Sequence, residues 1–428
     1  MKTINNTAPA TTITCPACGL LCDDIALNPE LNTPANTSCP KSIHFFEQAY
    51  AVNANMMPSI AGQPVDISSA IKAAADILHA SKQPLFAGLG TEVQGIRTVL
   101  RLAEKVGATL DHMHNEGGIR NTLTLQNSGW QNTTLMEVKN RADVILAIGT
   151  DIVSSHPRFF EKLVWNEHSM FDKPYPEIIY LCAPANTPAE NFNAGISPEG
   201  KAPTIITADT AHLPEIINAL NALINNKKIK TEQVAGVATA TLQNVLDKLK
   251  TAKYAVITWG AGNFKYANAE LTIQGITQIV SKLNETSRAA GLPLNAGDGD
   301  MSVNNVSTWL SSYPTRNRFT QEKTEYNPHL FSTKKQLESC DGLLWISTFN
   351  AHLPPHTNST IPTIVIGHPN MKFDRMPNVF IPVGIPGVDH IGTMLRMDNV
   401  VSLPLKKSRE TTLPSLSQVI QQILDCMS

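Results

Sequence analysis

Four cysteines near the N-terminus constrain this chain more than any other feature. Cys15, Cys18 and Cys22 fall within one eight-residue stretch, and Cys39 follows in the spacing C-x2-C-x3-C-x16-C. Three thiolates so close together can wrap one corner of an iron–sulfur cluster, and a fourth from a returning loop can close it. The spacing therefore predicts a [4Fe–4S]-type site with these four ligands. A zinc site of four cysteines and an empty site are the alternatives, because tetrahedral zinc accepts the same soft ligands.

The composition excludes several classes of protein. A net charge of −2 over 428 residues offers no basic surface for nucleic acid or an anionic membrane. No apolar run approaches the roughly 18 residues of a spanning helix. The first residues have neither the basic nor the apolar region of a secretory signal. Seven cysteines, an odd number with three of them scattered, are typical of reduced thiols. We therefore expect a cytoplasmic protein that binds neither nucleic acid nor a membrane.

Apolar runs that alternate with amphipathic stretches predict an α/β fold. Residues Asp143–Asp151 form a continuous apolar run that ends in Gly-Thr-Asp, and Gly342–Ser347 form a similar run. Such runs are typical of strands buried on both faces of a parallel sheet. We predict doubly wound, mainly parallel α/β domains in which strands 143–149 and 343–347 are central and buried. Ligands of such sheets bind beyond the carboxyl ends of the strands.

Three helices have clear sequence signals. The stretch Ile67–Ala80 has apolar residues at helical spacing and follows Asp66, a favourable N-cap residue. The stretch Glu92–Val106 precedes Gly107, a residue type that favours the end of a helix. We predict a helix over each stretch, and a third over Leu416–Leu424.

The pattern divides the chain into four parts. The first 60 residues carry the cysteines and few apolar residues, so we predict a small cap whose fold depends on the cluster. Two α/β domains are expected over residues 61–230 and 231–378. A β-rich segment with a terminal helix is expected over 379–428, where prolines and glycines interrupt short apolar runs.

Two motifs at opposite ends of the chain point to a known family. The first is Cys15-x2-Cys-x3-Cys-Asp-Asp24, and the second is Gly384-Ile-Pro-Gly-Val-Asp389 with the following segment Gly392–Asp398. Together with two α/β blocks, they resemble the B subunit of formylmethanofuran dehydrogenase, in the molybdopterin oxidoreductase superfamily. The resemblance covers essentially the whole length. It implies domains like those of formate dehydrogenase and dimethyl sulfoxide reductase. It also implies that the four N-terminal cysteines hold a [4Fe–4S] cluster, which relays electrons to a tungsten or molybdenum bis-pterin site.

One loop departs from the family pattern. In family members that reduce carbon dioxide, a cysteine or selenocysteine ligates the tungsten or molybdenum. The corresponding stretch here, Asp111–Arg120, contains no cysteine, and none occurs from 40 to 181. This departure resembles the formyltransferase/hydrolase complex of methylotrophic bacteria, in which no electrons need to flow and the B subunit can lose its redox metal.

The departure leads to an expected function. We expect a non-redox structural subunit, without a catalytic residue of its own and without the bis-pterin metal. Its partners would be the other subunits of a complex that moves a formyl group from tetrahydromethanopterin to a methanofuran-type carrier and releases formate. The alternative is an active dehydrogenase subunit, in which Asp111, Glu116 or a histidine substitutes for the thiolate.

Loops after predicted strands are candidates for pterin-type contacts. In the superfamily such loops contact pterin nucleotides, although the motif Gly260-x-Gly262 is only half of a dinucleotide fingerprint. Plain turns are the alternative for these loops, and an ion pair with Asp398 is the alternative for Arg396. The six candidate residues are Gly149, Thr150, Asp151, Gly260, Gly262 and Arg396.

Three further motifs have metal-ligand residue types but are incomplete as patterns. His112-x-His114 has no third ligand nearby in the sequence, so histidines of a pocket or the surface are expected. Prolines between His352 and His356 forbid a helix, so we predict a loop there. The motif Asp298-Gly-Asp300 begins like a calcium loop but does not end in the required glutamate.

Overall fold

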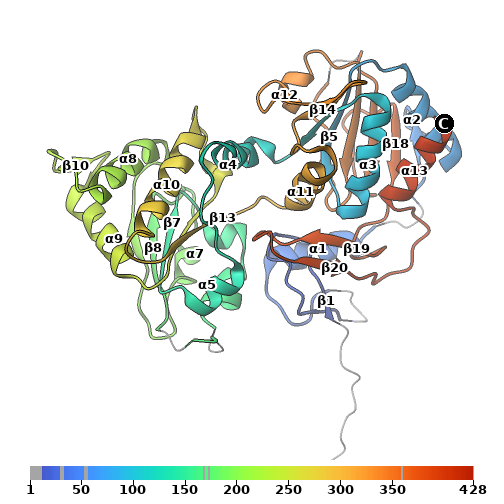
Figure 1. Cartoon of the computed structure of the whole chain (residues 1–428). Helices are drawn as coiled ribbons and strands as arrows, with labels where there is room; N and C mark the ends of the chain where they lie inside the picture. Colours follow the sequence, from blue (N-terminus) through green and yellow to red (C-terminus); the bar gives the residue numbers. More distant parts are fainter. Residues whose placement is uncertain are drawn as a thin grey trace, which may run out of the picture. The chain divides into compact units, whose positions relative to one another are not determined.

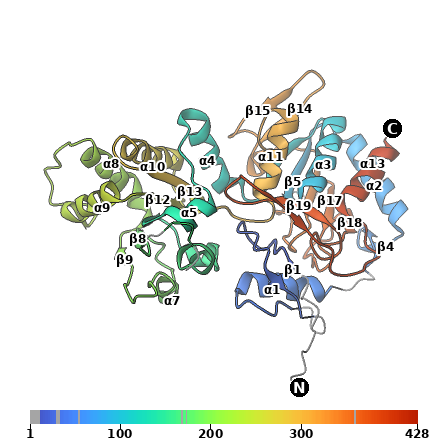
Figure 2. The ribbon, with the colours of Figure 1, turned by 60° about the horizontal axis from the view of Figure 1, so that its bottom comes forward.

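The computed structural model describes residues 12–28, 33–52, 56–166, 169–171, 174–357 and 360–427. The chain forms two compact units, drawn from two directions in Figure 1 and Figure 2. Unit 1 contains the chain up to Asn115, Gly297–Arg396 and the chain from Val401 onward, and unit 2 contains Glu116–Ala296 and Met397–Val400. Each unit is built on its own main β-sheet. Among the described residues, no helix is both long and apolar enough to cross a membrane.

A nine-stranded sheet in the order β15-β14-β6-β5-β16-β17-β18-β3-β4 forms the centre of unit 1. The five strands from β6 to β18 are parallel, and short antiparallel strands extend both edges. Strand β16 is the fifth of the nine and is buried at every residue. The prediction of a central strand at 343–347 is therefore confirmed, since an apolar strand needs cover on both faces. The strands are β3 (Ser59–Ile60), β4 (Gln63–Pro64), β5 (Pro84–Gly90), β6 (Thr109–His112), β14 (Asn317–Phe319), β15 (Thr324–Tyr326), β16 (Gly342–Ser347), β17 (Thr363–Gly367) and β18 (Val379–Pro382).

Four helices cover one face of this sheet, and loops with the short helix α12 cover the other. Side chains alternate along β16, so Leu344 and Ile346 point to one face while Leu343 and Trp345 point to the other. The first pair lies in one cluster with apolar residues of four helices, of which α2, α3 and α13 lie side by side in Figure 1. The second pair packs with loop residues such as Met371. The four helices are α2 (Ile67–Ala80), α3 (Val93–Val106), α11 (Asp300–Ser311) and α13 (Leu416–Cys426). The short helix α12 consists of Thr333–Gln336.

Side-chain caps define the starts of the first two of these helices. Asp66 Oδ1 accepts a hydrogen bond from the Ser69 N–H at 2.9 Å, ahead of α2. The Glu92 carboxylate accepts two bonds from N–H groups in the first turn of α3, at 2.6 and 2.7 Å. Helix α3 ends at Gly107, whose φ is +72°. These contacts satisfy N–H groups that a helix start leaves unpaired. Both predicted helices are confirmed, with Glu92 as the cap of α3 instead of its first residue.

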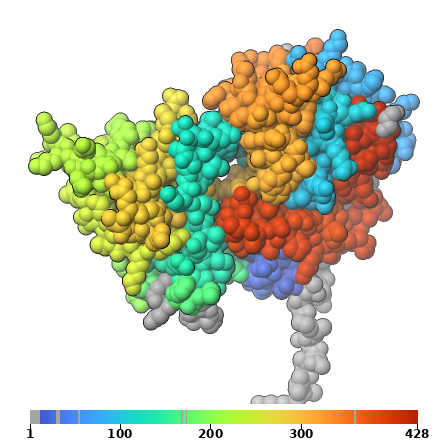
Figure 3. Space-filling model, in the orientation of Figure 1, coloured from blue at the N-terminus to red at the C-terminus, as the bar shows by residue number. Residues whose placement is uncertain are grey.

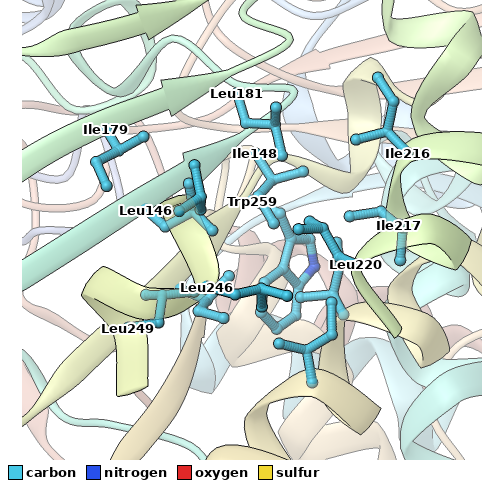
Figure 4. Packing of buried hydrophobic residues seen from close by; sticks show 14 of the residues in the cluster. Leu146, Ile148, Ile179, Leu181, Ile216, Ile217, Leu220, Leu246, Leu249 and Trp259 are labelled. Atoms are coloured by element: carbon cyan, nitrogen blue, oxygen red, sulfur yellow. The ribbon is translucent and has the colours of Figure 1, made fainter. Parts of the chain in front are cut away.

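A five-stranded, fully parallel sheet in the order β13-β12-β7-β8-β9 forms the centre of unit 2. Strand β7 is the third of the five and is entirely buried, which confirms the prediction for residues 143–149. Figure 4 shows the packing on one face of the sheet, where Leu146 and Trp259 lie in one apolar cluster with Leu246. The elements are α4 (Asn115–Ser128), α5 (Leu135–Arg141), β7 (Val144–Ile148), α6 (Ile152–Ser155), a π-helical turn (Phe160–Val164), β8 (Glu177–Leu181), α7 (Ala189–Asn193), β9 (Thr204–Ile206), α8 (Leu213–Ile224), β10 (Gln233–Val234), β11 (Val237–Ala238), α9 (Thr239–Thr251), β12 (Ala255–Trp259), α10 (Ala269–Leu283) and β13 (Ala289–Pro293), with 3₁₀ turns at Thr210–His212 and Ala261–Asn263.

The cysteine-bearing segment packs against the C-terminal part of unit 1. Its Phe45 and Phe46 share an apolar cluster with Ile385 and Met394. In Figure 3 the blue N-terminal segment lies against red C-terminal residues of the same unit. Residues distant in sequence therefore supply apolar cover that the first 60 residues lack. The elements involved are β1 (Thr12–Ile13), β2 (Ile25–Ala26), α1 (Pro40–Tyr50), β19 (Gly392–Leu395) and β20 (Ser402–Leu405).

The two units differ from the four-part division drawn from the sequence. Residues 61–115 and 297–396 belong to one unit, because β5 pairs with β16 and β18 continues the same sheet. The segment 116–296 folds on a sheet of its own and interrupts unit 1 in the chain order. The boundaries expected at 230 and 378 therefore do not coincide with those of the units. Pairing between strands so far apart in the sequence has no local signal.

An aspartate just before the central strand of each sheet holds the turn before a neighbouring strand. Asp341 accepts hydrogen bonds from the last two N–H groups before β5, at 2.7 and 2.8 Å. Asp143 accepts bonds from the two corresponding N–H groups before β12, at 2.7 and 3.0 Å. The same device therefore aligns the amino ends of adjacent parallel strands in both units.

We expect Asp341→Asn to lower the free energy of unfolding by about 1–2 kcal/mol near neutral pH, because an amide cannot accept hydrogen bonds through both terminal atoms. Burial acts to raise the pKa of Asp341, but hydrogen bonds from Ser81 and the adjacent backbone outweigh it and hold the pKa below its ordinary value. Such a carboxylate stabilises the fold above its unfolded-state pKa, and its contribution is lost as the pH falls through the lowered folded-state pKa.

Urea unfolding at two pH values measures this effect. The difference in free energy of unfolding between the parent protein and Asp341→Asn should be largest near neutral pH and should shrink at roughly pH 3. Asp76→Asn, an exposed substitution in α2, is the matched control and should change stability little. An unchanged deficit at acid pH would show that the carboxylate charge is not responsible.

Candidate functional site

Each main sheet contains one point at which the strand order reverses. In unit 1 the chain passes from β5 to β6 on one side, and β16, β17 and β18 lie on the other side. In unit 2 the chain passes from β7 to β8 and β9, and β12 and β13 lie on the other side. Ligands of open α/β sheets bind beyond the carboxyl ends of the strands at such a switch point. The candidate edges are therefore those of β5 with β16 and of β7 with β12.

In unit 2 the predicted glycine loops meet at this edge. The loop Gly149–Asp151 follows β7 and Gly260 follows β12, and these two strands are direct parallel neighbours. The Asn263 Nδ2 donates to the Gly149 carbonyl at 3.1 Å, and a Cβ on Gly260 would lie 2.8 Å from the Thr150 hydroxyl oxygen. The fold thus brings the two loops together in close packing.

One charged side chain of these loops takes part in the fold itself. The Asp151 carboxylate caps α6 and accepts a hydrogen bond from Asn191 Nδ2 at 2.6 Å. Gly262 lies close to the first turn of α4, where a Cβ on Gly117 would be 2.8 Å from the Gly262 Cα. Arg396, the sixth candidate, belongs to unit 1 and directly follows β19. Pterin contacts stay a prediction for all six residues.

The four predicted cluster ligands lie in one folded segment of unit 1. The loop from Cys15 to Cys22 closes on itself, because the Cys15 N–H donates to the Cys22 carbonyl at 2.9 Å. Cys39 is the N-cap residue of α1, and Ser42 in the first turn of that helix contacts the Cys15 thiol. All seven cysteines of the chain carry free thiols. The start of α1 therefore brings Cys39 toward the cysteine loop.

Burial dominates the electrostatics of this segment. It raises the pKa of the Cys15 thiol to about 12, an effect that Ser42 opposes and that the neighbouring Cys18 and Cys22 thiols reinforce. A soft metal group would therefore have to displace the proton of this thiol. The sulfurs around a single zinc ion lie about 3.8 Å apart. Among the described residues, no three of the thiols all lie within 4.8 Å of one another, so they are less tightly gathered.

The stretch in which the family has its metal-binding cysteine begins with a buried ion pair. Asp111 Oδ1 lies 3.2 Å from Arg316 Nε and accepts a hydrogen bond from Asn115 Nδ2 at 2.9 Å. Its Oδ2 accepts bonds from the N–H and hydroxyl groups of Thr333, at 2.6 and 2.8 Å. Both oxygens thus serve the fold, and Asp111 is not positioned as a substitute metal ligand. Glu116, the other acidic candidate, lies exposed in α4 of unit 2.

Two histidines and an aspartate converge at the switch point of unit 1. His114 follows β6, His352 follows β16, and Asp298 lies in the loop that leads into α11. Asp298 Oδ2 lies 2.8 Å from His114 Nε2 and 3.2 Å from His352 Nε2. One ligand atom from each of the three side chains lies within 4.8 Å of the other two. We call these three residues the His–Asp–His cluster.

Hydrogen bonds from neighbouring side chains hold this cluster. Asn350 Nδ2 donates to the second carboxylate oxygen of Asp298, Oδ1, at 2.6 Å. The ring of His112 is buried, and its Nδ1 accepts a bond from the backbone N–H of His114 at 3.2 Å. The proton of the neutral ring is therefore on Nε2, which donates to the Asp298 carbonyl at 3.3 Å. His112 thus joins the end of β6 to the loop that carries Asp298.

The backbone around the cluster is tightly constrained as well. The Trp345 Nε1 donates to the His352 carbonyl at 2.7 Å, which anchors the loop to β16. Gly297, Asp298 and Gly299 have φ values of +113°, +51° and +77°. A Cβ on Gly299 would lie 2.1 Å from the Thr91 carbonyl oxygen, so only glycine fits there. A left-handed aspartate costs about 1–3 kcal/mol and persists where the surrounding structure enforces it.

The protonation of the cluster follows from these contacts. Burial acts to raise the pKa of Asp298, but hydrogen bonds from His114 and His352 outweigh it and hold the pKa far below its ordinary value. The bond to Asp298 raises the pKa of His352, and burial lowers the pKa of His112. An ionised carboxylate therefore lies between two imidazoles.

Sequence reasoning identified the members of the cluster but not the set. The His112-x-His114 motif was expected to lack a third ligand, and the loop predicted at His352 is confirmed. The two histidines are separated by over two hundred residues in the chain, and the aspartate comes from a third segment. The one usable signal was that two of the segments follow apolar stretches of the chain, but the domain boundary predicted at residue 230 assigned those stretches to different sheets.

Comparisons with known proteins bear on the identity of the chain. No family model matches it. The chain is 28% identical over 411 residues to the B subunit of tungsten-containing formylmethanofuran dehydrogenase 2 from Methanococcus maripaludis, with 91% of each chain covered. It is 26% identical over 331 residues to the B subunit of the formyltransferase/hydrolase complex Fhc from Methylorubrum extorquens, with 77% of this chain and 85% of that protein covered.

A solved structure agrees with these relatives in fold. The chain superposes with a TM-score of 0.72 on a chain of the formyltransferase/hydrolase complex FhcABCD from Methylorubrum extorquens, whose crystal structure was determined in complex with methylofuran. The superposition covers 86% of this chain and 98% of that chain, at 23% sequence identity. The resemblance indicated by the cysteine motif and the C-terminal segment is confirmed, and the chain is a homologue of the B subunits of formylmethanofuran dehydrogenase and of the Fhc complex.

Proposed function

We propose that this chain is the B-type subunit of a multi-subunit complex of one-carbon metabolism. The complex transfers a formyl group from tetrahydromethanopterin to a methanofuran-type carrier and releases formate by hydrolysis. In it the chain is a structural subunit that performs no redox chemistry. The observation that carries the proposal is homology to B subunits over nine-tenths of the chain, combined with a metal-site loop that lacks the family's cysteine.

The donor set at that loop does not fit a tungsten or molybdenum bis-pterin. Such a metal depends on a soft thiolate for its electronic tuning, and residues 40–181 contain no cysteine. Asp111, the first substitute, already uses both carboxylate oxygens in contacts with Arg316, Asn115 and Thr333. We therefore assign no reaction step to this chain and place the formyl-transfer and hydrolysis chemistry on its partner subunits.

The N-terminal cysteines do fit an iron–sulfur group. Cys15, Cys18, Cys22 and Cys39 would be its ligands, since four soft thiolates from a closed loop and a helix start are the donor set that such clusters use. When bound, the cluster would supply one-electron transfer or, in a non-redox subunit, a structural cross-link.

The complex is tested by purifying it through a tag on this chain. Two assays are run anaerobically on the same preparation: formate release from formyl-tetrahydromethanopterin with a methanofuran-type carrier, and reduction of a viologen dye with formylated carrier. We expect formate release without dye reduction, and neither activity from the isolated chain. Dye reduction that requires tungsten or molybdenum during expression would overturn the proposal and support the dehydrogenase alternative.

The cluster has a separate test. Anaerobically purified protein is expected to contain iron and acid-labile sulfide, and Cys39→Ser should remove most of both because a cubane needs all four thiolate ligands. Cys182→Ser, at a buried cysteine of unit 2, is the matched control and should retain both. Zinc in place of iron and sulfide would support the zinc alternative, and equal iron contents in the two variants would contradict the ligand assignment.

A further inference from the structure

The His–Asp–His cluster of unit 1 has the chemistry of a metal site that is separate from the cysteines. We propose that His114, Asp298 and His352 bind one divalent first-row transition ion, of which zinc is the representative. Two imidazoles and one carboxylate suit zinc and ferrous iron, and three protein ligands leave at least one position open for water or another ligand. This inference does not rest on the proposed function, because it concerns only side chains within unit 1.

The distances require little rearrangement. Ligand atoms around a tetrahedral zinc ion lie about 3.3 Å apart, given metal–ligand bonds of about 2.0–2.1 Å. Asp298 Oδ2 is 2.8 and 3.2 Å from the two Nε2 atoms, and the atoms of all three residues are within 4.8 Å of one another. The two aspartate–histidine distances are at or slightly below this value, so opening them by a few tenths of an ångström suits an ion. The ligand atoms of the two imidazoles lie within 4.8 Å of each other.

The supporting contacts are those that orient metal ligands. The second oxygen of Asp298 is held by Asn350, so Oδ2 remains directed between the imidazoles. His112 uses both ring nitrogens on the backbone of His114 and Asp298, and it therefore positions two ligands without being one itself. In known metal sites, groups that hydrogen-bond to the metal-binding residues fix the orientation of those residues. The strained loop at Asp298 gives the same positioning from the backbone side.

Charge and access also favour an ion. The Asp298 side chain is only 7% exposed, so its negative charge lies in a medium that screens poorly. A divalent ion would balance that charge while leaving both imidazoles neutral, the form in which histidine binds metals. The His114 and His352 side chains are 29% and 46% exposed, so an ion can enter from their side. The location at a switch point is where open α/β sheets bind ligands.

The test is cobalt binding to chelator-treated full-length protein, because cobalt reports its ligands by absorption. Cobalt held by cysteine thiolates gives strong sulfur-to-metal charge-transfer bands, and cobalt held by imidazole and carboxylate does not. We expect one equivalent that is bound without these bands and displaced by zinc, in addition to any cobalt that the cysteines bind with these bands. His352→Ala and Asp298→Asn should each weaken this binding by roughly 100-fold or more, since even an outer partner of a metal ligand contributes 10–100-fold.

His356→Ala is the matched control, because His356 is an exposed histidine of the same loop. It should bind cobalt like the parent protein, and zinc should raise the melting temperature of both. Folding of each variant is checked by circular dichroism in the metal-free state, and His114→Ala replaces any variant that unfolds. Equal affinities for the parent, His352→Ala and Asp298→Asn would overturn the proposal. So would cobalt binding that shows only thiolate bands.

Discussion

Leu246→Ala is expected to lower the free energy of unfolding of unit 2 by about 2–5 kcal/mol, because it leaves a cavity in a closely packed core. Leu246 lies in α9 and is fully buried in the cluster of Figure 4, between the sheet and the neighbouring helices. Urea unfolding followed by circular dichroism measures the loss. Hydrogen exchange of β12 peptides assigns it to unit 2, since local stability is read from backbone protection.

Leu271→Ala is the matched control for this prediction. Leu271 is also a helical leucine of unit 2, in α10, but its side chain is 59% exposed. Its replacement should change the free energy of unfolding by no more than about 0.5 kcal/mol. Similar losses for Leu246→Ala and Leu271→Ala would mean that α9 does not pack on the sheet as described.

Arg316→Met is expected to lower the free energy of unfolding of unit 1 by about 3–5 kcal/mol, because it leaves the Asp111 carboxylate buried without its cation. The side chains of Arg316 and Asp111 are only 5% and 4% exposed, and Arg316 also donates to the Pro328 carbonyl at 2.6 Å. Methionine keeps much of the side-chain volume of arginine, so the lost free energy measures mainly the contribution of the guanidinium group. Urea unfolding is again the measurement, with hydrogen exchange of β6 peptides as the local reading.

Two further variants make this prediction specific. Lys335→Met breaks an exposed ion pair in which Lys335 Nζ lies 2.8 Å from Glu338 Oε2. It should lower the free energy of unfolding by less than about 1 kcal/mol. The double variant Asp111→Asn/Arg316→Met buries no unpaired charge and should be less destabilised than the sum of its single variants. Additive losses would show that the buried ion pair does not couple the two residues.

The relation between the two candidate metal groups follows from the fold. The cysteine segment and the His–Asp–His cluster both belong to unit 1, yet they use different ligand chemistry, thiolate in one and imidazole with carboxylate in the other. Soft thiolates suit iron–sulfur clusters, and borderline imidazoles suit single divalent ions. The removal of one group should therefore leave the other intact, so the iron and cobalt measurements proposed above can be read independently.

Local structure was largely predictable from the sequence. The strands β7 and β16 carry unbroken apolar runs, and such runs require burial on both faces wherever they lie in the chain. Helix α3 was predictable because Glu92 and Gly107 act within one turn of its ends. The loops at Gly149 and Gly260 were each predictable, because each follows an apolar strand, but the boundary predicted at residue 230 placed them in different domains.

The long-range arrangement was decided only by the tertiary structure. The pairing of β5 with β16 joins in one sheet a strand that precedes unit 2 in the sequence and a strand that follows it. No local pattern encodes which apolar strands become neighbours. That pairing brings His352 to His114, and the strained loop at Asp298 completes the cluster. The sequence by itself thus determined the elements, the family relationship and the cysteine motif, since these depend on short-range spacing. The tertiary structure decided the division into units, the buried ion pair of Asp111 with Arg316, and the His–Asp–His cluster. The reason is that contacts between distant residues form only when the whole sheet assembles.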